Sequence, residues 1–408
     1  MPTQSKFQSM ALIDAVETIW RENRCLNEAS IKIYQHWIRR FFTYCQTKHL
    51  NEHDQATLKG VSAFSRWYAR AHNANEKVVF CSARSAIGAW AFALKVLGKP
   101  MPLWREPDHN SCSRSPIIRG FATHLRQHRG SPEITIHKKV KQTEQFMAFL
   151  RKRRRRIQRL RLQDIDDYIA CCCKCYSHST VADICSTLRA FVSYLRVCDR
   201  IPIDFSLSIM TPKRIIEEQP VKTLPWDDVR KILQAIDRKT ACGRRDYALL
   251  LMMSVYGLGS GEIICLQLDD IDWATQTLHI TRPKTGVEFV LPILPPVAEA
   301  LADYIHQGRP VHTQSRHLFI TMKAPYKKLA CSVTIRHILH THAQTAGVTA
   351  DFLGTHVLRH THACRQLDLG LPQKVIGDIL GHRDPASTSK YLRVSIEHLR
   401  ELALKVPS

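Results

Sequence analysis

The 408-residue sequence predicts a mainly α-helical protein with a small antiparallel sheet in its C-terminal part, which is therefore α+β. Up to about residue 215, apolar residues recur three and four positions apart, as in IKIYQHWIRRFFTYC (31–45) and ADICSTLRAFVSYLRV (182–197), and few segments show strand patterns. Residues 268–293, in contrast, alternate between apolar and polar residues and contain turn signals. These two patterns determine the predicted fold class.

The charge of the chain favours a polyanionic partner. Lysine and arginine number 59 against 36 aspartate and glutamate residues, so the formal net charge is +23. Such an excess suits nucleic acid or an anionic membrane surface. The membrane is the weaker interpretation, because the N-terminus lacks the apolar run of a signal peptide and the most apolar stretch, YALLLMMSVYGLG (247–259), is too short to span a bilayer. We therefore expect a cytoplasmic protein.

Fourteen cysteines are scattered through the chain, and without a secretion signal we expect them to be reduced thiols. Several gather in CCCKCYSH (171–178), which holds Cys171, Cys172, Cys173, Cys175 and His178. Adjacent cysteines on a helix point in different directions, and the second, distant pair of a zinc site is missing. We therefore predict a helix lined with buried thiols, and no metal.

The helical part predicts two modules, divided near residues 105–117. A weak internal similarity supports the division, since SIKIYQHWIRRFFTYC (30–45) resembles TIHKKVKQTEQFMAFL (135–150). We assign residues 1–110 to the first module and residues 113–212 to the second. Four aromatic residues of the first module recur at helical spacing, which predicts core positions rather than a base-stacking surface: Tyr34, Trp37, Phe41 and Phe42.

A third domain, residues 222–408, follows a proline-containing linker, TPKRIIEEQPVKTLPWDDV (211–229). The linker ends in a helix-start pattern at Pro225. Next, RRDYALLLMMSVYGLG (244–259) predicts a buried helix. In the predicted sheet, one turn presents Lys284 at a hairpin tip, away from the core.

The segment THVLRHTHACRQLDLGLP (355–372) predicts one helix that begins with a threonine cap and stops at Gly370. His356, Arg359 and His360 then lie on one face of this helix. Taken alone, this arrangement fits a solvated basic face equally well.

The segment after this helix changes that balance. A further helix, PQKVIGDIL (372–380), ends at Gly381 and leaves His382 in a turn. After a short loop, Ser387 and Thr388 can cap a last helix that carries Tyr391.

The motifs HVLRH, then LGH, then a tyrosine nine residues after its histidine resemble the C-terminal signature of the tyrosine recombinase (phage integrase) family. The lysine in an upstream sheet turn fits the same pattern, and the similarity covers residues 222–395 as a catalytic domain. The two helical modules resemble the N-terminal DNA-binding modules of such enzymes, the second of them the SAM-like, core-binding module. Each motif is weak alone, but their order and spacing together are specific.

The resemblance implies a role in catalysis for each of these residues. Tyr391 would attack a DNA phosphodiester and form a 3′-phosphotyrosyl intermediate. Arg359 and His382 would bind the non-bridging oxygens, and His356 would assist proton transfer at the nucleophile. Lys284 would protonate the leaving 5′-oxygen. Because the cations are side chains, no metal or other cofactor is expected.

The sequence departs from the family at one position. The family has an arginine in a Gly-Leu-Arg motif, but here Gly259 stands in its place, followed by the supporting acid Glu262. Losing one such cation costs about 10²–10⁵ in rate. The substitute could come in cis from Arg282, Arg244 or Arg245, or in trans from a partner subunit. Otherwise the chain is a DNA-binding accessory subunit, while a related recombinase does the cutting.

The resemblance also bears on the basic run RKRRRR, which consists of Arg151, Lys152, Arg153, Arg154, Arg155 and Arg156. A solvated charge run is a common outcome, but in a DNA-handling protein a grip on phosphates is the favoured interpretation. An RNA-binding role is disfavoured because no RNA-module signature is present.

For partners, the resemblance implies double-stranded DNA and a homo- or hetero-tetramer in a synaptic complex, in the nucleoid-containing cytoplasm, with a role in mobile-element integration or excision. The tail SIEHLRELALKVPS (395–408) places Ile396, Leu399 and Ala403 on one helical stripe. That stripe packs either on its own catalytic domain or on a neighbouring subunit.

Overall fold

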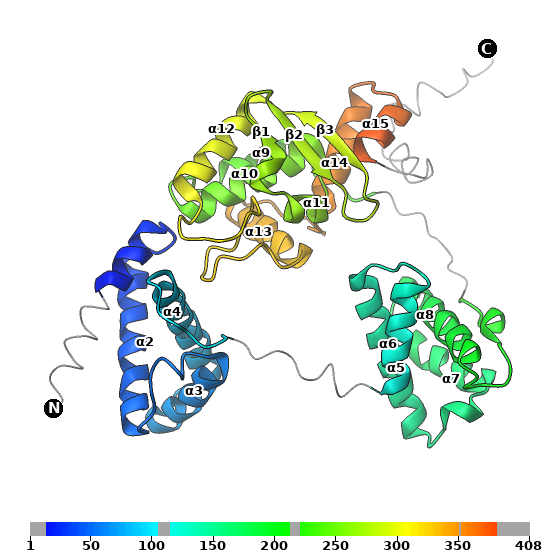
Figure 1. The fold of residues 1–408 in the computed structure, drawn as a ribbon. Helices are drawn as coiled ribbons and strands as arrows, with labels where there is room; N and C mark the ends of the chain where they lie inside the picture. The colour runs from blue at the N-terminus through cyan, green and yellow to red at the C-terminus, as the bar shows by residue number, and fades with distance from the viewer. Residues whose placement is uncertain (1–13, 105–114, 213–220, 351, 382–408) are drawn as a thin grey trace, which may run out of the picture. The chain divides into compact units, whose positions relative to one another are not determined.

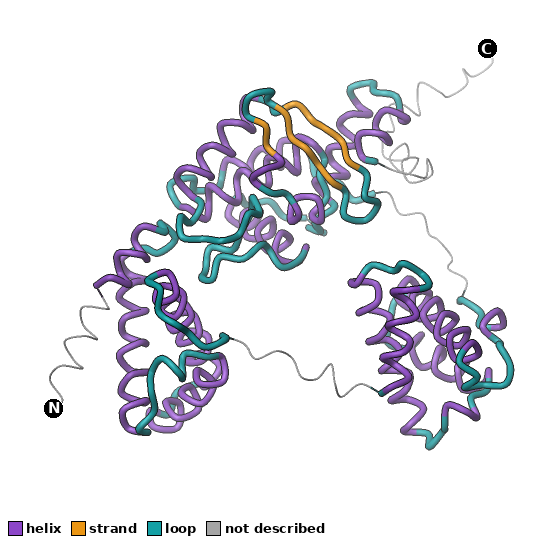
Figure 2. Tube along the Cα trace, viewed as in Figure 1, coloured by secondary structure: helices purple, strands orange, loops and turns teal. Residues whose placement is uncertain are grey.

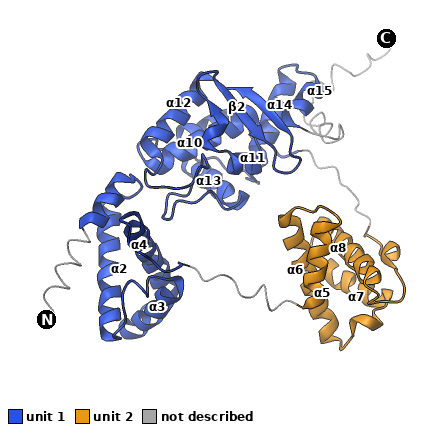
Figure 3. Cartoon of the chain, in the orientation of Figure 1, with its two compact units in different colours: residues 1–106, 220–408 blue, residues 107–219 orange. Residues whose placement is uncertain are grey.

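The computed structural model describes residues 14–104, 115–212, 221–350 and 352–381. Contacts divide the chain into two compact units, residues 1–106 with 220–408 and residues 107–219 (Figure 3). Helices make up most of the described chain, and its strands form one three-stranded antiparallel sheet in the C-terminal domain (Figure 2). The predicted fold class is therefore confirmed.

The first module is a helical bundle built from α2 (Glu28–Thr47), α3 (Leu58–His72) and α4 (Glu76–Val96) (Figure 1). Each of these helices begins at an N-cap side chain that accepts a hydrogen bond from the backbone of the first turn: Asn27, Thr57 and Asn75. Phe41 is fully buried in the core, and Tyr34, Trp37 and Phe42 pack against it. The prediction that these aromatic residues form core is confirmed.

Helix α4 is the one helix of the described residues that is long and apolar enough to cross a membrane by length and composition. In this fold it packs against α2 and α3, with Ala86, Ile87 and Leu94 fully buried. Its apolar composition is therefore accounted for by the core of the module.

The second module contains α5 (Pro116–Gln127), α6 (Glu133–Lys152), α7 (Leu162–Cys173) and α8 (His178–Val197), with 3₁₀ turns at Ile157–Arg159 and Ser206–Ser208. Its core includes Phe121, Phe146 and Phe191, each fully buried.

The cysteine-rich segment of this module corrects one prediction. Cys172 is buried, but Cys171, Cys173, Cys175 and His178 are exposed. Neighbouring residues of a helix are about 100° apart, so only one of three consecutive cysteines at the end of α7 can face the core. The expected lining of buried thiols is wrong.

The C-terminal domain begins with α9 (Trp226–Gln234), α10 (Ala241–Tyr256) and α11 (Ser260–Cys265). Helix α9 starts after Pro225, as the sequence predicts. Helix α10 is buried along most of its length and ends at Gly257, whose φ of 63° is the left-handed conformation of a helix C-cap.

The sheet follows, with strands β1 (Ile271–Asp272), β2 (Thr277–Thr281) and β3 (Glu288–Pro292) in the order β1-β2-β3. Strand β2 pairs with β3 in antiparallel register, with Thr281 opposite Glu288. The hairpin predicted from the sequence is confirmed.

Four helical segments complete the described domain: α12 (Pro295–Asp303) with the π-helical turn Tyr304–Gly308, α13 (Ser332–Thr345), α14 (Val357–Asp368) and α15 (Gln373–Leu380). The N-cap position of α14 is His356, which is in the helical conformation and makes no side-chain capping hydrogen bond, instead of the expected threonine. The N–H of Val357, the first residue of the helix, donates to the carbonyl of Gly354 at 3.0 Å.

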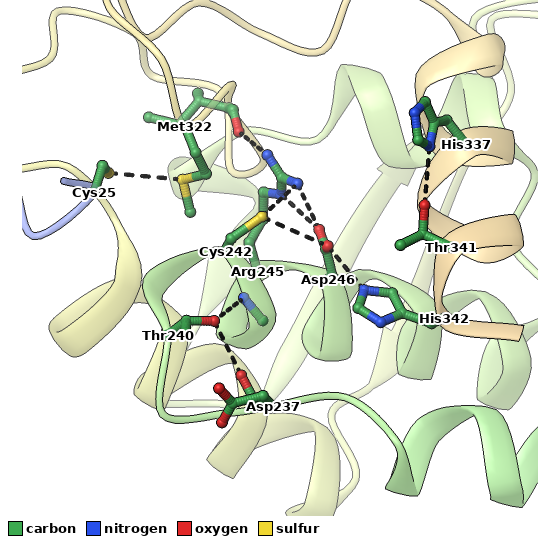
Figure 4. Close-up of polar contacts among 12 residues, drawn as sticks. Cys25, Asp237, Thr240, Cys242, Arg245, Asp246, Met322, His337, Thr341 and His342 are labelled. Carbon is green, nitrogen blue, oxygen red and sulfur yellow. Dashed lines mark hydrogen bonds and ion pairs between the residues drawn. The ribbon is translucent and has the colours of Figure 1, made fainter. Parts of the chain in front are cut away.

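Within this domain, α10 carries a buried ion-pair network (Figure 4). The Arg245 guanidinium donates two hydrogen bonds to Asp246, at 2.6 and 2.8 Å, and a third to the Ile320 carbonyl. The second oxygen of Asp246 lies 3.0 Å from His342 Nε2 on α13. The network ties α10 to α13 and to the segment that joins the π-helical turn to α13.

We expect Asp246→Ala to lower the free energy of unfolding by about 3–5 kcal/mol, because it leaves the buried Arg245 charge without its partner. A matched control is Asp303→Ala, which removes the partner of the more exposed Arg244 and should cost about 1 kcal/mol or less. Chemical denaturation of the full chain measures both. Equal losses in the two variants would contradict the structural role assigned to the buried pair.

Candidate active site

The Glu262 carboxylate is the centre of a buried polar cluster. Glu262 lies in the first turn of α11 and is 8% exposed. Its Oε2 accepts a hydrogen bond of 2.6 Å from the N–H of Gly259 and one of 3.2 Å from Nη1 of Arg359. The backbone of Gly259 and the side chain of Arg359 therefore share one carboxylate oxygen.

Arg359 is held from three directions. Besides Glu262, its guanidinium donates to the carbonyl of Gly257 at 3.1 Å and to that of Leu380, in the last turn of α15. Gly257 has room for no side chain, because a Cβ there would lie 2.7 Å from the His362 ring. These main-chain acceptors carry no sequence signal, so only the structure identifies them.

Arg282 reaches the same carboxylate from the end of β2. Its Nε lies 3.2 Å from Glu262 Oε1, and its Nη2 donates to the carbonyl of Ile379 at 2.7 Å. The guanidinium carbon lies 4.1 Å from the ring centroid of Phe289. Burial lowers the pKa of Arg282, Glu262 opposes that effect, and the charge of Arg359 lowers the pKa further.

The other described candidates lie nearer the surface. Lys284 is exposed in the β2–β3 turn, where the carbonyl of Arg282 accepts from the N–H of Gly286 at 2.8 Å. His356 is exposed at the start of α14, and its ring stacks on His360 with centroids 6.0 Å apart. Both side chains are accessible to a large ligand, whereas the Glu262 cluster is mostly covered.

Arg244 and Arg245 do not join the cluster. Arg244 pairs with Asp303 at 2.9 Å, and Arg245 belongs to the Asp246 network. Of the three candidate substitutes for the missing arginine, the structure brings only Arg282 to Glu262.

Helix α15 ends at Gly381, with φ of 63°, as predicted. His382 and Tyr391 lie outside the described residues, as do the caps Ser387 and Thr388. The same holds for the stripe of the tail, Ile396, Leu399 and Ala403.

The arginines of the basic run in the second module differ in their contacts. Arg153 pairs with Asp167, and Arg155 lies 3.2 Å from the buried Asp164. Arg154, Arg155, Arg156 and Arg159 line an open cavity of about 370 Å³. The run thus combines arginines that anchor the loop after α6 with arginines that face solvent.

No group of three or more histidine, cysteine, aspartate or glutamate side chains is arranged to hold a metal ion within the part of the chain that the structure describes.

Family models and related proteins match two parts of the chain. Residues 222–398 match the model of the Phage integrase family, and residues 118–197 match that of the phage integrase N-terminal SAM-like domain. The protein named "Putative integrase/recombinase y4gC" of Sinorhizobium fredii is 40% identical over 45% of this chain and 95% of its own length. A second S. fredii protein of the same description, y4rA, is 31% identical over 74% of this chain and 73% of its own length.

A solved structure shows the same fold. The chain resembles a lambda integrase tetramer bound to a Holliday junction with a TM-score of 0.52 and 16% identity, over 74% of this chain and 84% of that one. The family models, the relatives and this fold agree with the motifs of the sequence. The chain therefore belongs to the phage integrase family, the tyrosine-type site-specific DNA recombinases.

Proposed function

We propose that this chain cuts and rejoins DNA at specific sites through Tyr391. The phenolic oxygen of Tyr391 attacks the scissile phosphorus, and the bond from phosphorus to the 5′-oxygen breaks. The products are a 3′-phosphotyrosyl bond and a free 5′-hydroxyl. The energy of the broken bond is kept in the new ester, so religation needs no external energy source.

The observation that carries this proposal is the fixed position of Arg359. Hydrogen bonds to Glu262, Gly257 and Leu380 hold its guanidinium before any substrate arrives. A pentacovalent phosphorane carries more negative charge than the diester, and a preorganised planar cation stabilises that extra charge without reorganisation.

The remaining candidate residues have complementary roles. His382 follows Gly381 directly and would donate a hydrogen bond to the same non-bridging oxygens. His356 would take part in moving the tyrosine proton, and Lys284, exposed at the hairpin turn, would give a proton to the leaving 5′-oxygen. All of these groups are amino-acid side chains, so the proposed chemistry uses no cofactor.

We assign the DNA contacts to three regions: residues 1–110, the SAM-like module 113–212, and the catalytic domain 222–408. The net charge of +23 and the match of residues 118–197 to the N-terminal domain of phage integrases support this assignment. The lambda integrase relative is a DNA-bound tetramer, and we propose a homo- or hetero-tetramer here, in the cytoplasm at the nucleoid. The proposed role is integration or excision of a mobile element.

One observation favours a second candidate function. Gly259 replaces the first arginine of the family pattern, so the chain could instead serve as a non-catalytic, DNA-binding subunit beside a related recombinase. The two functions differ in one product, the covalent link between Tyr391 and DNA.

We expect the purified full chain to form an SDS-stable adduct with a nicked duplex that carries the DNA flanking its own gene, and the Tyr391→Phe variant to form none. The nick lets the short strand beyond the cut diffuse away, which traps the intermediate. Binding of the duplex without any adduct would favour the accessory function.

Log affinity falls as log salt concentration rises, and each lost phosphate contact makes this fall less steep by about 0.9. For the basic run, we expect Arg154→Ala and Arg156→Ala each to reduce the steepness by that amount. Arg153→Ala is the matched control, because Arg153 already pairs with Asp167 and should leave the slope unchanged. Titration of a labelled duplex at several salt concentrations measures the slopes. Slopes equal to that of the wild type in all three variants would show that the run is merely solvated.

A further inference from the structure

The absence of an arginine at position 259 is not imposed by the backbone. Gly259 has φ −76° and ψ 155°, an extended conformation that any residue adopts. A Cβ there would lie 3.5 Å from Glu262 Oε2 and 3.6 Å from Arg359 Nη1, which are ordinary contacts. A side chain at position 259 would therefore begin next to Glu262 and Arg359. The backbone permits an arginine there, so the missing charge can be sought in another residue.

The guanidinium of Arg282 has the environment of an active-site cation. Glu262 contacts Arg282 through Oε1 and Arg359 through Oε2, in both cases at 3.2 Å. The two side chains are similarly covered, with 8% of Arg282 and 12% of Arg359 exposed. Their Nη2 atoms donate to consecutive carbonyls of α15, those of Ile379 and Leu380. The two arginines thus form a matched pair on one carboxylate and one helix end.

The third nitrogen of Arg282 occupies the space of a missing side chain. A Cβ built on Gly381 would lie 0.8 Å from Nη1 of Arg282, so this nitrogen stands where any other residue would place its side chain. Gly381 directly precedes His382, the residue assigned to the scissile phosphate. Arg282 therefore reaches the backbone position that precedes the residue proposed to bind the phosphate.

We propose that Arg282 is the catalytic cation that replaces the first arginine of the family, supplied in cis from the β2–β3 hairpin; this inference rests on the proposed function. The charge balance supports it. Two arginines and one glutamate give the family pattern a net charge of +1, and Arg282, Arg359 and Glu262 give the same value here. In the transition state Arg282 shares the charge of the non-bridging oxygens with Arg359.

Other sources of the charge fit the structure less well. Arg244 and Arg245 are bound to Asp303 and Asp246, away from Glu262. An arginine from a partner subunit would have to compete for Glu262, whose two oxygens already contact Arg282, Arg359 and the Gly259 N–H.

The test measures single-turnover cleavage of the nicked duplex by the full chain at saturating protein. We expect Arg282→Met, which keeps the buried stem but removes the charge, to slow cleavage about 10²–10⁵-fold. Adding Gly259→Arg to that variant should restore part of the rate, since position 259 opens onto Glu262. Arg244→Met is the matched control and should cleave like the wild type.

A neutral substrate separates catalysis from support of the fold. A methylphosphonate at the scissile position carries less negative charge on its non-bridging oxygen, which is the charge that Arg282 is proposed to stabilise. The loss of cleavage rate in Arg282→Met should therefore shrink markedly on this substrate. A merely structural role predicts the same defect on both substrates, and that result would overturn the proposal even if the variant were less stable.

The outcomes distinguish this inference from the proposed function. Wild-type cleavage that depends on Tyr391, together with an Arg282→Met rate within about threefold of wild type, refutes the inference alone. A wild-type chain that forms no Tyr391 adduct refutes the proposed function, and the inference falls with it.

Discussion

The shared Glu262 carboxylate is the interaction on which the rest of the site depends. It places one acidic group between two buried guanidinium groups, and without it the two cations would face each other in a poorly solvated space. The same carboxylate caps α11 through the N–H of Gly259. One side chain therefore contacts the start of α11, the residue that follows β2 and the first turn of α14.

The C-terminus of α15 completes this arrangement. The last carbonyls of a helix find no N–H donor within the helix. Here the carbonyls of Ile379 and Leu380 accept hydrogen bonds from the two arginines instead. Gly381 makes this possible in two ways, since its left-handed conformation ends the helix and its missing side chain leaves room for Arg282. The contacts that hold the two cations therefore also involve the residues that end α15.

Much of the fold follows from local patterns in the sequence, whereas the site depends on contacts that no local pattern encodes. Apolar periodicity predicts α10, and glycine predicts the end of α15, because each depends on neighbouring residues. The cap of α14 and the exposure of three cysteines were mispredicted, since the surrounding fold decides both. The sequence alone does not distinguish Arg244, Arg245 and Arg282 as substitutes. Their ion pairs in the folded chain do, since these are formed with Asp303, Asp246 and Glu262 respectively.

The position of Arg282 has a mechanical consequence for the hairpin. Its side chain is anchored to α11 and α15, while its carbonyl accepts the N–H of Gly286 and so closes the turn that holds Lys284. In the family pattern the first arginine stands at the position of Gly259, beside α11, and the lysine lies in a later sheet turn. Here the proposed phosphate-binding cation, Arg282, stands two positions before the proposed general acid, Lys284. The Glu262 ion pair and the turn that presents Lys284 therefore share one residue, so a displacement of Arg282 would also disturb that turn.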